Sequence, residues 1–490
     1  MWDDRPVIVA NPHLQPPLWH WPEITWILGF HAILRFMPVT WLANLVICGL
    51  SKTSLAYHLS LLILHLLNSL LVYHLVLRLL VRFASNEAPR EVIAFMASAF
   101  WAVNGQRVEV LGWSATLGHP VATLFALGSF HYYLNSMHEG RLQFRPYLWS
   151  FILNGLSVCA YPISLGYAFC LPFFDRLFFP KEVSHRWNPR SPGFGTYWTS
   201  RALFTLPSIA IILATIQARV HPINEFVQFE APVRASILLR LIHAVYAWAY
   251  IYSHEFWPFG LTPGHFAWIG LNFHWVYLPA LLLILGLFVF SWWEKSSIPL
   301  AILAISVLLA APMLGLTENP STPGDRHSYL PCAFFSLLLA WIASRCWPRR
   351  PTSNAGWIAL GSGLALIALM GLQSHRQLRI WENSYTLFTR MEASPEIQAQ
   401  PALQAHIHSV EANQLILDGQ LSAALKIYDE LIRFSPGDYR YWHQRGLTLH
   451  LLGREPEALQ SLRTAYALGR SPLTLQLIES ITATTLPAKP

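Results

Sequence analysis

Long apolar stretches dominate this sequence, and residues 55–81 are the first that could cross a membrane unaided. Arg78 is the only charged side chain in the stretch. About 20 apolar residues in a helix span the hydrocarbon core of a bilayer, so the stretch predicts a membrane-spanning helix. His58, His65 and Asn68 are polar groups at that depth, and we expect them to face protein or a water-filled cavity.

The composition also indicates an integral membrane protein. Hydrophobic residues make up 54% of the 490 residues and charged residues only 12%, about half the share of a typical soluble domain. The formal net charge of +7 has a membrane explanation, because the lysines and arginines stand in short loops between apolar stretches. No basic run is interleaved with exposed aromatic residues, so nucleic acid is not an expected partner.

Further apolar stretches complete a predicted bundle of about ten spans. They cover residues 92–103, 117–134, 147–161, 163–179, 203–216, 275–293, 298–316, 329–344 and 356–372. Several are shorter than the roughly 20 residues an isolated span needs, but a compact bundle can shelter short or broken helices.

The basic residues predict an orientation for this bundle. Most loop arginines and lysines gather on the cytoplasmic face if residues 235–257 do not cross the membrane. We therefore expect this aromatic-rich segment to be interfacial or re-entrant. The N-terminal segment, residues 104–119, 219–274 and 317–327, and the C-terminal domain then all fall on the outer face.

The chain divides into three parts by composition. Residues 1–52 are rich in Pro and Trp and predict an outer-face loop with one or two interfacial helices. Residues 53–373 form the predicted membrane bundle. Residues 374–490 have the ordinary polar composition of a small helical domain.

This C-terminal domain contains an internal repeat. Gly419 is followed five residues later by Ala424. The same pair occurs again 34 residues further along the chain, as Gly453 and Ala458. That period is typical of tetratricopeptide repeats, in which small residues let paired helices approach. Two units are fewer than the three or so usually needed for stability, so flanking helices or the membrane domain are expected to complete the array.

Two adjacent carboxylates, Asp3 and Asp4, stand beside Arg5 near the start of the chain. Paired carboxylates suit general-base chemistry near neutral pH. A disordered acidic terminus would have the same composition, and these residues taken alone leave both interpretations open.

Several motifs, taken in order, give the chain a family resemblance. They are WDDRPVIVANP at the start, PVTW at 38–41, the stretch from Tyr57-His58 to Asn68, RVEVLGW at 107–113, LPFFD at 171–175, GDRHSYLP at 324–331 and the terminal repeats. In this order they resemble the multi-pass GT-C glycosyltransferases with tetratricopeptide repeats, relatives of the O-mannosyltransferases. The resemblance covers nearly the whole chain and rests on the order and spacing of the motifs.

The resemblance implies an all-α fold: a polytopic GT-C-like transmembrane bundle, followed by a short repeat array and lacking one helix before Met1. The implied reaction moves a sugar from a polyprenyl-phosphate donor to a hydroxyl of a protein or glycan acceptor. No cofactor is implied for certain, although a divalent metal is possible in some subgroups. The implied location is the bacterial inner membrane, with the endoplasmic reticulum as the alternative and the repeats outside the cytoplasm.

The resemblance also assigns roles to residues. Asp3 or Asp4 would be the general base that deprotonates the acceptor, or a metal ligand. Glu109 would be a second acidic group of the site. Arg326, with Arg107, would bind the donor phosphate, for which a guanidinium fork is well suited.

Five further residues are candidates for the lining of the site: His58, His65, Asn104, His119 and Tyr329. Asn104 stands where family members usually have the histidine of a His-Pro pair, and His119 stands where they carry basic residues. For His58 and His65, structural hydrogen bonding across helices is the favoured alternative.

Plainer alternatives exist for the charged residues as well. Arg326 could pair with the neighbouring Asp325, Arg107 could pair locally with Glu109, and Glu109 could cap a helix.

Two other classes of function have the same hydropathy. A non-catalytic membrane-anchored scaffold would bind protein partners through its repeats, and it is the alternative that the departures from the family motifs favour. A lipid-sugar transporter or polymerase would need neither the repeats nor acidic and arginine motifs gathered on one face. The expected partners of the enzyme are the lipid-linked donor, the acceptor, proteins bound by the repeats, and membrane lipids.

Overall fold

The computed structural model is almost entirely helical over the residues that it describes. These are 8, 11–14, 21–28, 36–84, 88–138, 141–180, 190–191, 193–220, 236–261, 276–315, 324–347, 354–394, 398 and 401–485. Asp3 and Asp4 lie outside the described residues. The chain forms two compact units, Asp3–Arg379 and Ile380–Pro490.

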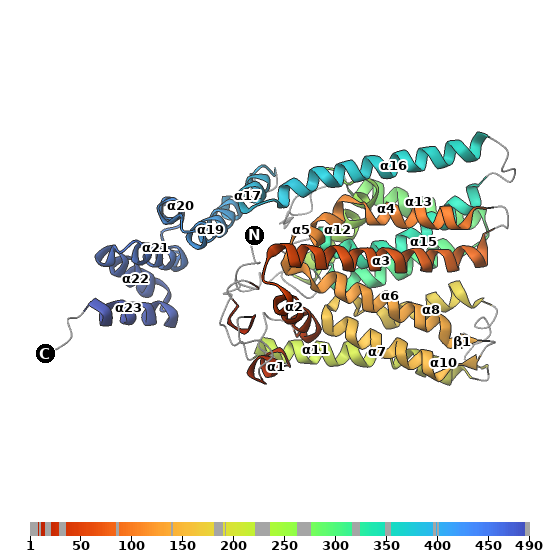
Figure 1. Cartoon of the computed structure of the whole chain (residues 1–490), viewed down its shortest axis with the longest axis horizontal. Helices are drawn as coiled ribbons and strands as arrows, with labels where there is room; N and C mark the ends of the chain where they lie inside the picture. The colour runs from red at the N-terminus through yellow and green to blue at the C-terminus, as the bar shows by residue number, and fades with distance from the viewer. Residues whose placement is uncertain are drawn as a thin grey trace. The chain divides into compact units, whose positions relative to one another are not determined.

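The larger unit is a bundle of helices (Figure 1). Its α-helices are α1 (Trp21–Leu28), α2 (Pro38–Leu50), α3 (Ser54–Phe83), α4 (Arg90–Ala102), α5 (Val108–Gly112), α6 (Gly118–Ser136), α7 (Phe144–Ala160), α8 (Tyr167–Phe178), α10 (Phe194–Ala202), α11 (Thr205–Val220), α12 (Ile237–Phe256), α13 (Tyr277–Trp293), α14 (Ile298–Ala310), α15 (Tyr329–Cys346) and α16 (Asn354–Leu378). Its short 3-10 helices include η3 (Gly105–Arg107), η4 (Ser114–Thr116) and η8 (Asp325–Ser328). A small antiparallel hairpin pairs β1 (Met137–His138) with β2 (Arg141–Leu142).

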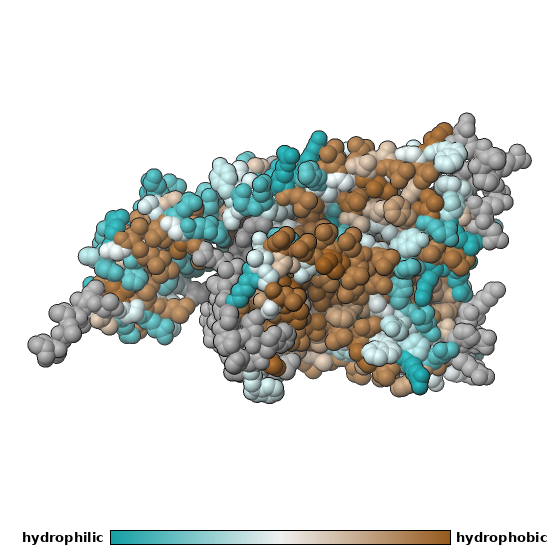
Figure 2. All heavy atoms as spheres, in the orientation of Figure 1, coloured by the Kyte–Doolittle hydropathy of each residue, from teal (hydrophilic) through white to brown (hydrophobic). Residues whose placement is uncertain are grey.

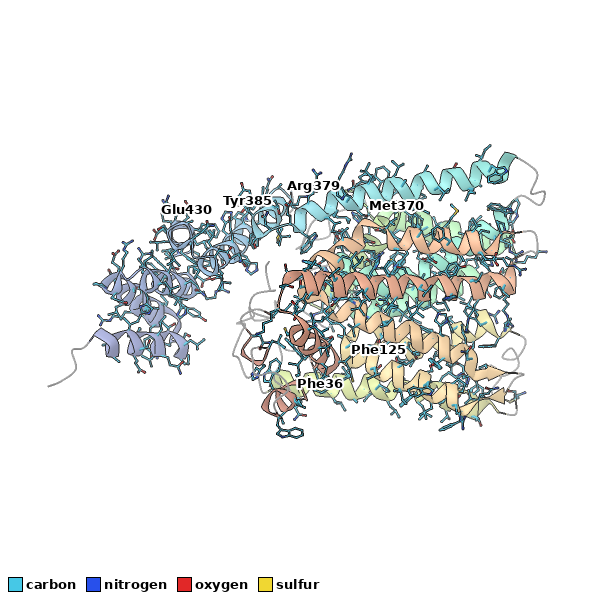
Figure 3. The ribbon with its side chains drawn as sticks, in the orientation of Figure 1. Phe36, Phe125, Met370, Arg379, Tyr385 and Glu430 are labelled. Carbon is cyan, nitrogen blue, oxygen red and sulfur yellow. The ribbon has the colours of Figure 1, made fainter. Side chains whose placement is uncertain are left out.

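The helix α15 lies at the centre of this bundle and α16 at its edge. In the most apolar 18 residues of Asp325–Cys346, the segment that contains α15, 72% are buried. The corresponding share in Gly356–Trp381, which contains most of α16, is 11%. A helix that is apolar on all sides is expected to be covered by others, and α3, α4, α6 and α14 pack against α15. On α16, Met370 lies on the side turned to the bundle and is only 4% exposed (Figure 3).

Four helical segments of the described chain are long and apolar enough to cross a membrane: Ser54–Phe83, Phe194–Gln217, Asp325–Cys346 and Gly356–Trp381. The bent pair Gly105–Gly112 and Ser114–Ser136 makes a fifth if it counts as one span. Shorter apolar helices cover Pro38–Leu50, Tyr277–Trp293 and Ile298–Met313. Apolar residues cover the middle of the visible face of the bundle, and hydrophilic residues gather toward the end that carries β1 (Figure 2). The count of about ten spans stays a prediction.

The aromatic-rich segment 235–257 forms the 20-residue helix α12. Tyr250, Tyr252 and Glu255 on this helix are fully or almost fully buried within the larger unit. The interfacial or re-entrant placement stays a prediction, but the helix clearly packs a polar face into the protein. That packing brings Glu255 into the site described below.

The C-terminal unit consists of consecutive helices. They are α17 (Ser384–Glu392), α19 (Pro401–Leu417), α20 (Leu421–Phe434), α21 (Tyr439–Leu451), α22 (Glu455–Gly469) and α23 (Pro472–Thr485). Helices that follow one another from α19 to α23 pack together.

The 34-residue sequence repeat corresponds to a structural repeat in this unit. Gly419 and Gly453 occupy equivalent turns with φ of 77° and 74°, a backbone conformation that favours glycine. Ala424 and Ala458, five residues later, are both fully buried. The assignment to the tetratricopeptide family stays a prediction.

Candidate functional site

The RVEVLGW motif forms a short helix that lies across the end of a long one. The segments Gly105–Gly112 and Ser114–Ser136 are bent by 101° at the residue between them, Trp113. Thr116 stabilises the bend, because its hydroxyl donates to the carbonyl oxygens of Val110 at 3.0 Å and Trp113 at 2.6 Å. Because of this break, Glu109 lies on a short helix that other elements contact, and not within a continuous span.

Asn104 begins this short helix and ties it to α12. Its side-chain oxygen accepts a hydrogen bond from the backbone nitrogen of Gln106 at 2.9 Å, which is an N-cap interaction. Its amide nitrogen donates to the backbone oxygen of Glu255 at 2.8 Å. A side chain on the next residue, Gly105, would come within 3.0 Å of Leu261 and 3.3 Å of Pro258. The Asn-Gly pair therefore fits a close contact between η3 and the segment after α12.

Glu109 and Arg326, 217 residues apart in the chain, form an ion pair. The same carboxylate accepts the backbone N–H of Arg326 at 2.9 Å. The Arg326 guanidinium also lies 5.1 Å from the centre of the Trp113 ring, within the range of a cation–π contact. Glu109 thus contacts both the backbone and the side chain of Arg326.

Arg107 pairs with Glu255, not with the neighbouring Glu109. Both side chains are 1% exposed, and Arg107 also donates to the Ser328 hydroxyl at 2.7 Å. Burial raises the pKa of the Glu255 carboxyl to about 7, and the Arg107 charge opposes the shift. Arg107 is therefore a buried group that joins η3, α12 and η8, and the alternative of a local pair with Glu109 is not what the structure shows.

A third carboxylate, Asp325, completes the cluster. The Tyr250 hydroxyl of α12 donates to it at 2.8 Å, and the Asp325 side chain is buried. With Glu109, Glu255 and Asp325 against Arg107 and Arg326, the cluster has one carboxylate more than guanidinium groups. Such a cluster favours retaining a proton on one carboxylate.

The members of this cluster differ in accessibility. The Arg326 side chain is 19% exposed, compared with 3% for Glu109. Asp325, Arg107 and Glu255 are each no more than 4% exposed. Arg326 is therefore the charged group of the cluster that a ligand would meet first.

Two of the predicted lining histidines hydrogen bond across helices. His58 of α3 bonds through Nδ1 to the backbone oxygen of Leu111 at 3.1 Å. His65 bonds through Nδ1 to the Tyr329 hydroxyl at 2.7 Å and through Nε2 to the backbone oxygen of Ala102 at 3.1 Å. Tyr329 is fully buried. These contacts hold α3 against α4, α5 and α15, the helices next to the cluster.

His119 lies at the start of α6, beside the bend. Its Nδ1 is 3.2 Å from the backbone oxygen of Thr116. Its ring lies 4.0 Å from the Tyr161 ring and 6.1 Å from the His327 ring, measured between centroids. Since His327 directly follows Arg326, His119 belongs to the surroundings of the cluster.

The LPFFD motif forms a separate buried ion pair. Asp175 accepts hydrogen bonds from Tyr133 at 2.8 Å, Tyr197 at 2.7 Å and Arg201 at 2.9 Å. The helix α10 carries Tyr197 and Arg201 and lies at the end of the bundle opposite α5 (Figure 1). With both carboxylate oxygens bonded, Asp175 is a structural residue that ties α6, α8 and α10 together.

Within the described part of the chain, no group of three or more His, Cys, Asp and Glu side chains is arranged to hold a metal ion. The metal-ligand role suggested for Asp3 or Asp4, like their role as a base, concerns residues outside the described ones.

The sequence interpretation missed Glu255 and Tyr250. A carboxylate inside an aromatic and apolar helix is itself a signal, since buried charges are expected to be paired. The partner of Glu255 could not be read from the sequence, because Arg107 lies 148 residues away in the chain.

Comparison with models of protein families, with curated proteins and with solved structures finds no match to this chain.

Proposed function

We propose that this protein is a membrane glycosyltransferase of the GT-C type. It moves a sugar from a polyprenyl-phosphate donor to a hydroxyl group of a protein or glycan acceptor on the extracytoplasmic face. The observation that carries the proposal is the Glu109–Arg326 ion pair, in which a partly exposed guanidinium is held at the edge of a buried charged cluster. The motif resemblance supplies the reaction class.

The proposed transfer needs two groups. A carboxylate takes the proton of the acceptor hydroxyl, whose oxygen forms a bond to the anomeric carbon of the sugar. The bond from that carbon to the phosphate oxygen breaks, and a cation stabilises the charge of the departing phosphate. Arg326 is the cation in this proposal, and Asp3 or Asp4 is the base.

The contacts of Arg326 suit this role. Its backbone and guanidinium are both held by Glu109, and its guanidinium lies against Trp113, so the charge is oriented before the donor arrives. Preorganised charge stabilises a developing anion without reorganisation at the moment of reaction. Arg107, paired with Glu255, also donates to Ser328 and so supports η8, the segment that carries Arg326.

Arg326→Ala tests the donor-binding role. The full-length protein is reconstituted in liposomes with a radiolabelled polyprenyl-phosphate sugar, and transfer is measured at varied donor and acceptor concentrations. We expect the donor KM to rise roughly tenfold or more, because a charge-assisted hydrogen bond to phosphate is lost. The acceptor KM should change little.

Arg145→Ala is the matched control, because Arg145 is an exposed arginine at the start of α7. It should leave both KM values unchanged. An Arg326→Ala variant that raises the donor and acceptor KM equally would remove the phosphate-binding role.

A second activity, protein binding by the C-terminal unit, is favoured by its consecutive helices and its structural repeat. It is also the basis of the scaffold alternative. Deletion of residues 405–490 should abolish recruitment of protein partners and leave sugar transfer intact. A chain that recruits partners but transfers no sugar from any lipid-phosphate donor would favour the scaffold.

A further inference from the structure

A groove of about 410 Å³ lies between α3 and α6, away from the charged cluster. It is lined by Leu71, His74, Leu77, Arg78, Val81 and His131. Arg78 follows His58 by 20 residues on α3, which is about 30 Å along a helix. Because His58 contacts α5 beside the cluster, the groove is a separate site near the other end of α3.

Arg78 is held in this groove by neutral groups. Its Nη1 donates to the Asn135 side-chain oxygen at 3.0 Å and to the His131 backbone oxygen at 3.4 Å. None of the described carboxylates pairs with it, and its Nε and Nη2 make no hydrogen bond to the described residues. The Nε–Nη2 edge of a guanidinium is a ready bidentate donor for a phosphate.

The surroundings of Arg78 add two imidazole rings and apolar walls. His74 lies one turn before Arg78 on the same face of α3. The His131 ring is fixed by a 3.0 Å hydrogen bond between its Nε2 and the Leu71 carbonyl oxygen. Val81 is 59% exposed, so part of the apolar wall is open to the outside of the bundle. A ligand with both an anionic group and a hydrocarbon chain matches this combination.

The length of α3 places the groove at the depth of lipid phosphates. Its 30 residues extend about 45 Å, about 15 Å more than the hydrocarbon core of a bilayer. If this excess length is divided equally between the two ends of α3, about five residues at each end lie outside the hydrocarbon core. Arg78 lies five residues before the last residue of the helix, Phe83, so it falls at the boundary between headgroups and hydrocarbon.

We propose that this groove binds one anionic phospholipid, with its phosphate on the Nε–Nη2 edge of Arg78 and an acyl chain along Leu71, Leu77 and Val81. His74 adds a second contact to the headgroup. The site rests on α3 crossing the membrane and is independent of the sugar transfer proposed above.

Native mass spectrometry of the purified full-length protein tests the proposal. The detergent-solubilised protein is titrated with dioleoylphosphatidylglycerol, with dioleoylphosphatidylcholine, and with inorganic phosphate as a competitor. We expect the anionic lipid to bind at least tenfold more tightly than the neutral one, and Arg78→Gln to remove about tenfold of that affinity. His74→Ala, at an exposed position, should weaken binding about threefold.

Arg145→Ala provides the control for a general attraction between arginines and anionic lipids, and it should leave binding unchanged. Equal losses in Arg78→Gln and Arg145→Ala would overturn the proposal. So would equal affinity for the two lipids, or displacement of the lipid by inorganic phosphate at equal concentration, which would indicate a site for the free anion. An Arg78→Gln chain that does not fold leaves His74→Ala as the deciding variant, and unchanged affinity in that variant overturns the proposal.

Discussion

Glu109 contacts Arg326 at two points, through the backbone nitrogen and through the guanidinium. The carboxylate is almost fully buried, whereas the guanidinium is partly exposed. Glu109 therefore acts on a ligand through Arg326 and is a positioning residue in the proposed mechanism. In that mechanism, the general base that deprotonates the acceptor hydroxyl is a different carboxylate.

A double-mutant cycle with Glu109→Gln and Arg326→Gln measures this dependence. We expect a coupling free energy of about 1–3 kcal/mol in detergent unfolding experiments, because each single change leaves the other group without its partner. The more accessible pair of Glu294 and Arg345, at 3.7 Å, is the control, and its coupling should stay below about 1 kcal/mol. Additive effects at Glu109 and Arg326 would show that the pair contributes nothing beyond its separate residues.

Asp438 predicts a pH dependence in the C-terminal unit. It caps α21 by accepting the backbone N–H of Arg440 at 3.0 Å, and it forms an ion pair with the same residue. Hydrogen bonds and the charge of Arg440 lower the pKa of Asp438, although its partial burial acts in the opposite direction. Its stabilisation is therefore complete above the ordinary carboxyl pKa of about 4 and is lost as the pH falls through the lower folded value.

Hydrogen exchange of α21, corrected for the intrinsic effect of pH, measures this loss. Protection in the wild type should decrease as the pH falls below about 4. Asp438→Asn keeps a good capping side chain but cannot titrate, so its protection should change less. The same decrease in both proteins would mean that another group is responsible.

At the scale of elements, α21 and α22 approach closely at a glycine. A side chain at Gly446 of α21 would come within 2.6 Å of Leu462 and 3.2 Å of the Ala458 backbone oxygen, both on α22. Gly446→Ala should therefore destabilise the pair by about 1–3 kcal/mol, as overpacking does. Gly437→Ala is the control, because nothing lies within 4 Å of its added carbon. Limited proteolysis of the C-terminal unit should separate the two variants, and equal resistance would contradict the close contact.

Helices were the part of this fold that the sequence predicted best. Apolar stretches such as 55–81 and 356–372 lie inside the helices α3 and α16, because long apolar runs allow little else. The segment 235–257 was harder, since its polar residues suggested a surface location. In the structure those polar residues include Glu255, which is buried with its partner Arg107. Polarity along one helix does not reveal whether its partners are water or protein.

The candidate site was predictable only as a set of separate residues. Glu109 and Arg326 are both in motifs of the resemblance, but their direct pairing depends on a bend at Trp113 that hydropathy does not encode. The donor-phosphate role of Arg107 stays a prediction, and its pairing with the buried Glu255 of α12 was not foreseen from the sequence. The register of packed helices decides such pairings, and a single sequence contains no direct signal for that register.

At the scale of the molecule, two units of different chemistry share one chain. The larger has helices long and apolar enough for a membrane, and the smaller consists of consecutive helices that contain the 34-residue repeat. In the proposed function, sugar transfer takes place at the charged cluster of the larger unit and partner binding at the repeats. The transfer depends on Arg326 and on the acidic residues Asp3 and Asp4.

The most direct test is sugar transfer by the purified full-length protein in liposomes. Radiolabelled mannosyl and glucosyl polyprenyl phosphates are the donors, and peptides rich in Ser and Thr are the acceptors. We expect transfer of label to acceptor hydroxyls, and a loss of about 100-fold or more in either Asp3→Asn or Asp4→Asn, because a general base is removed. The absence of transfer from both donors, or full activity in both variants, would contradict this expectation.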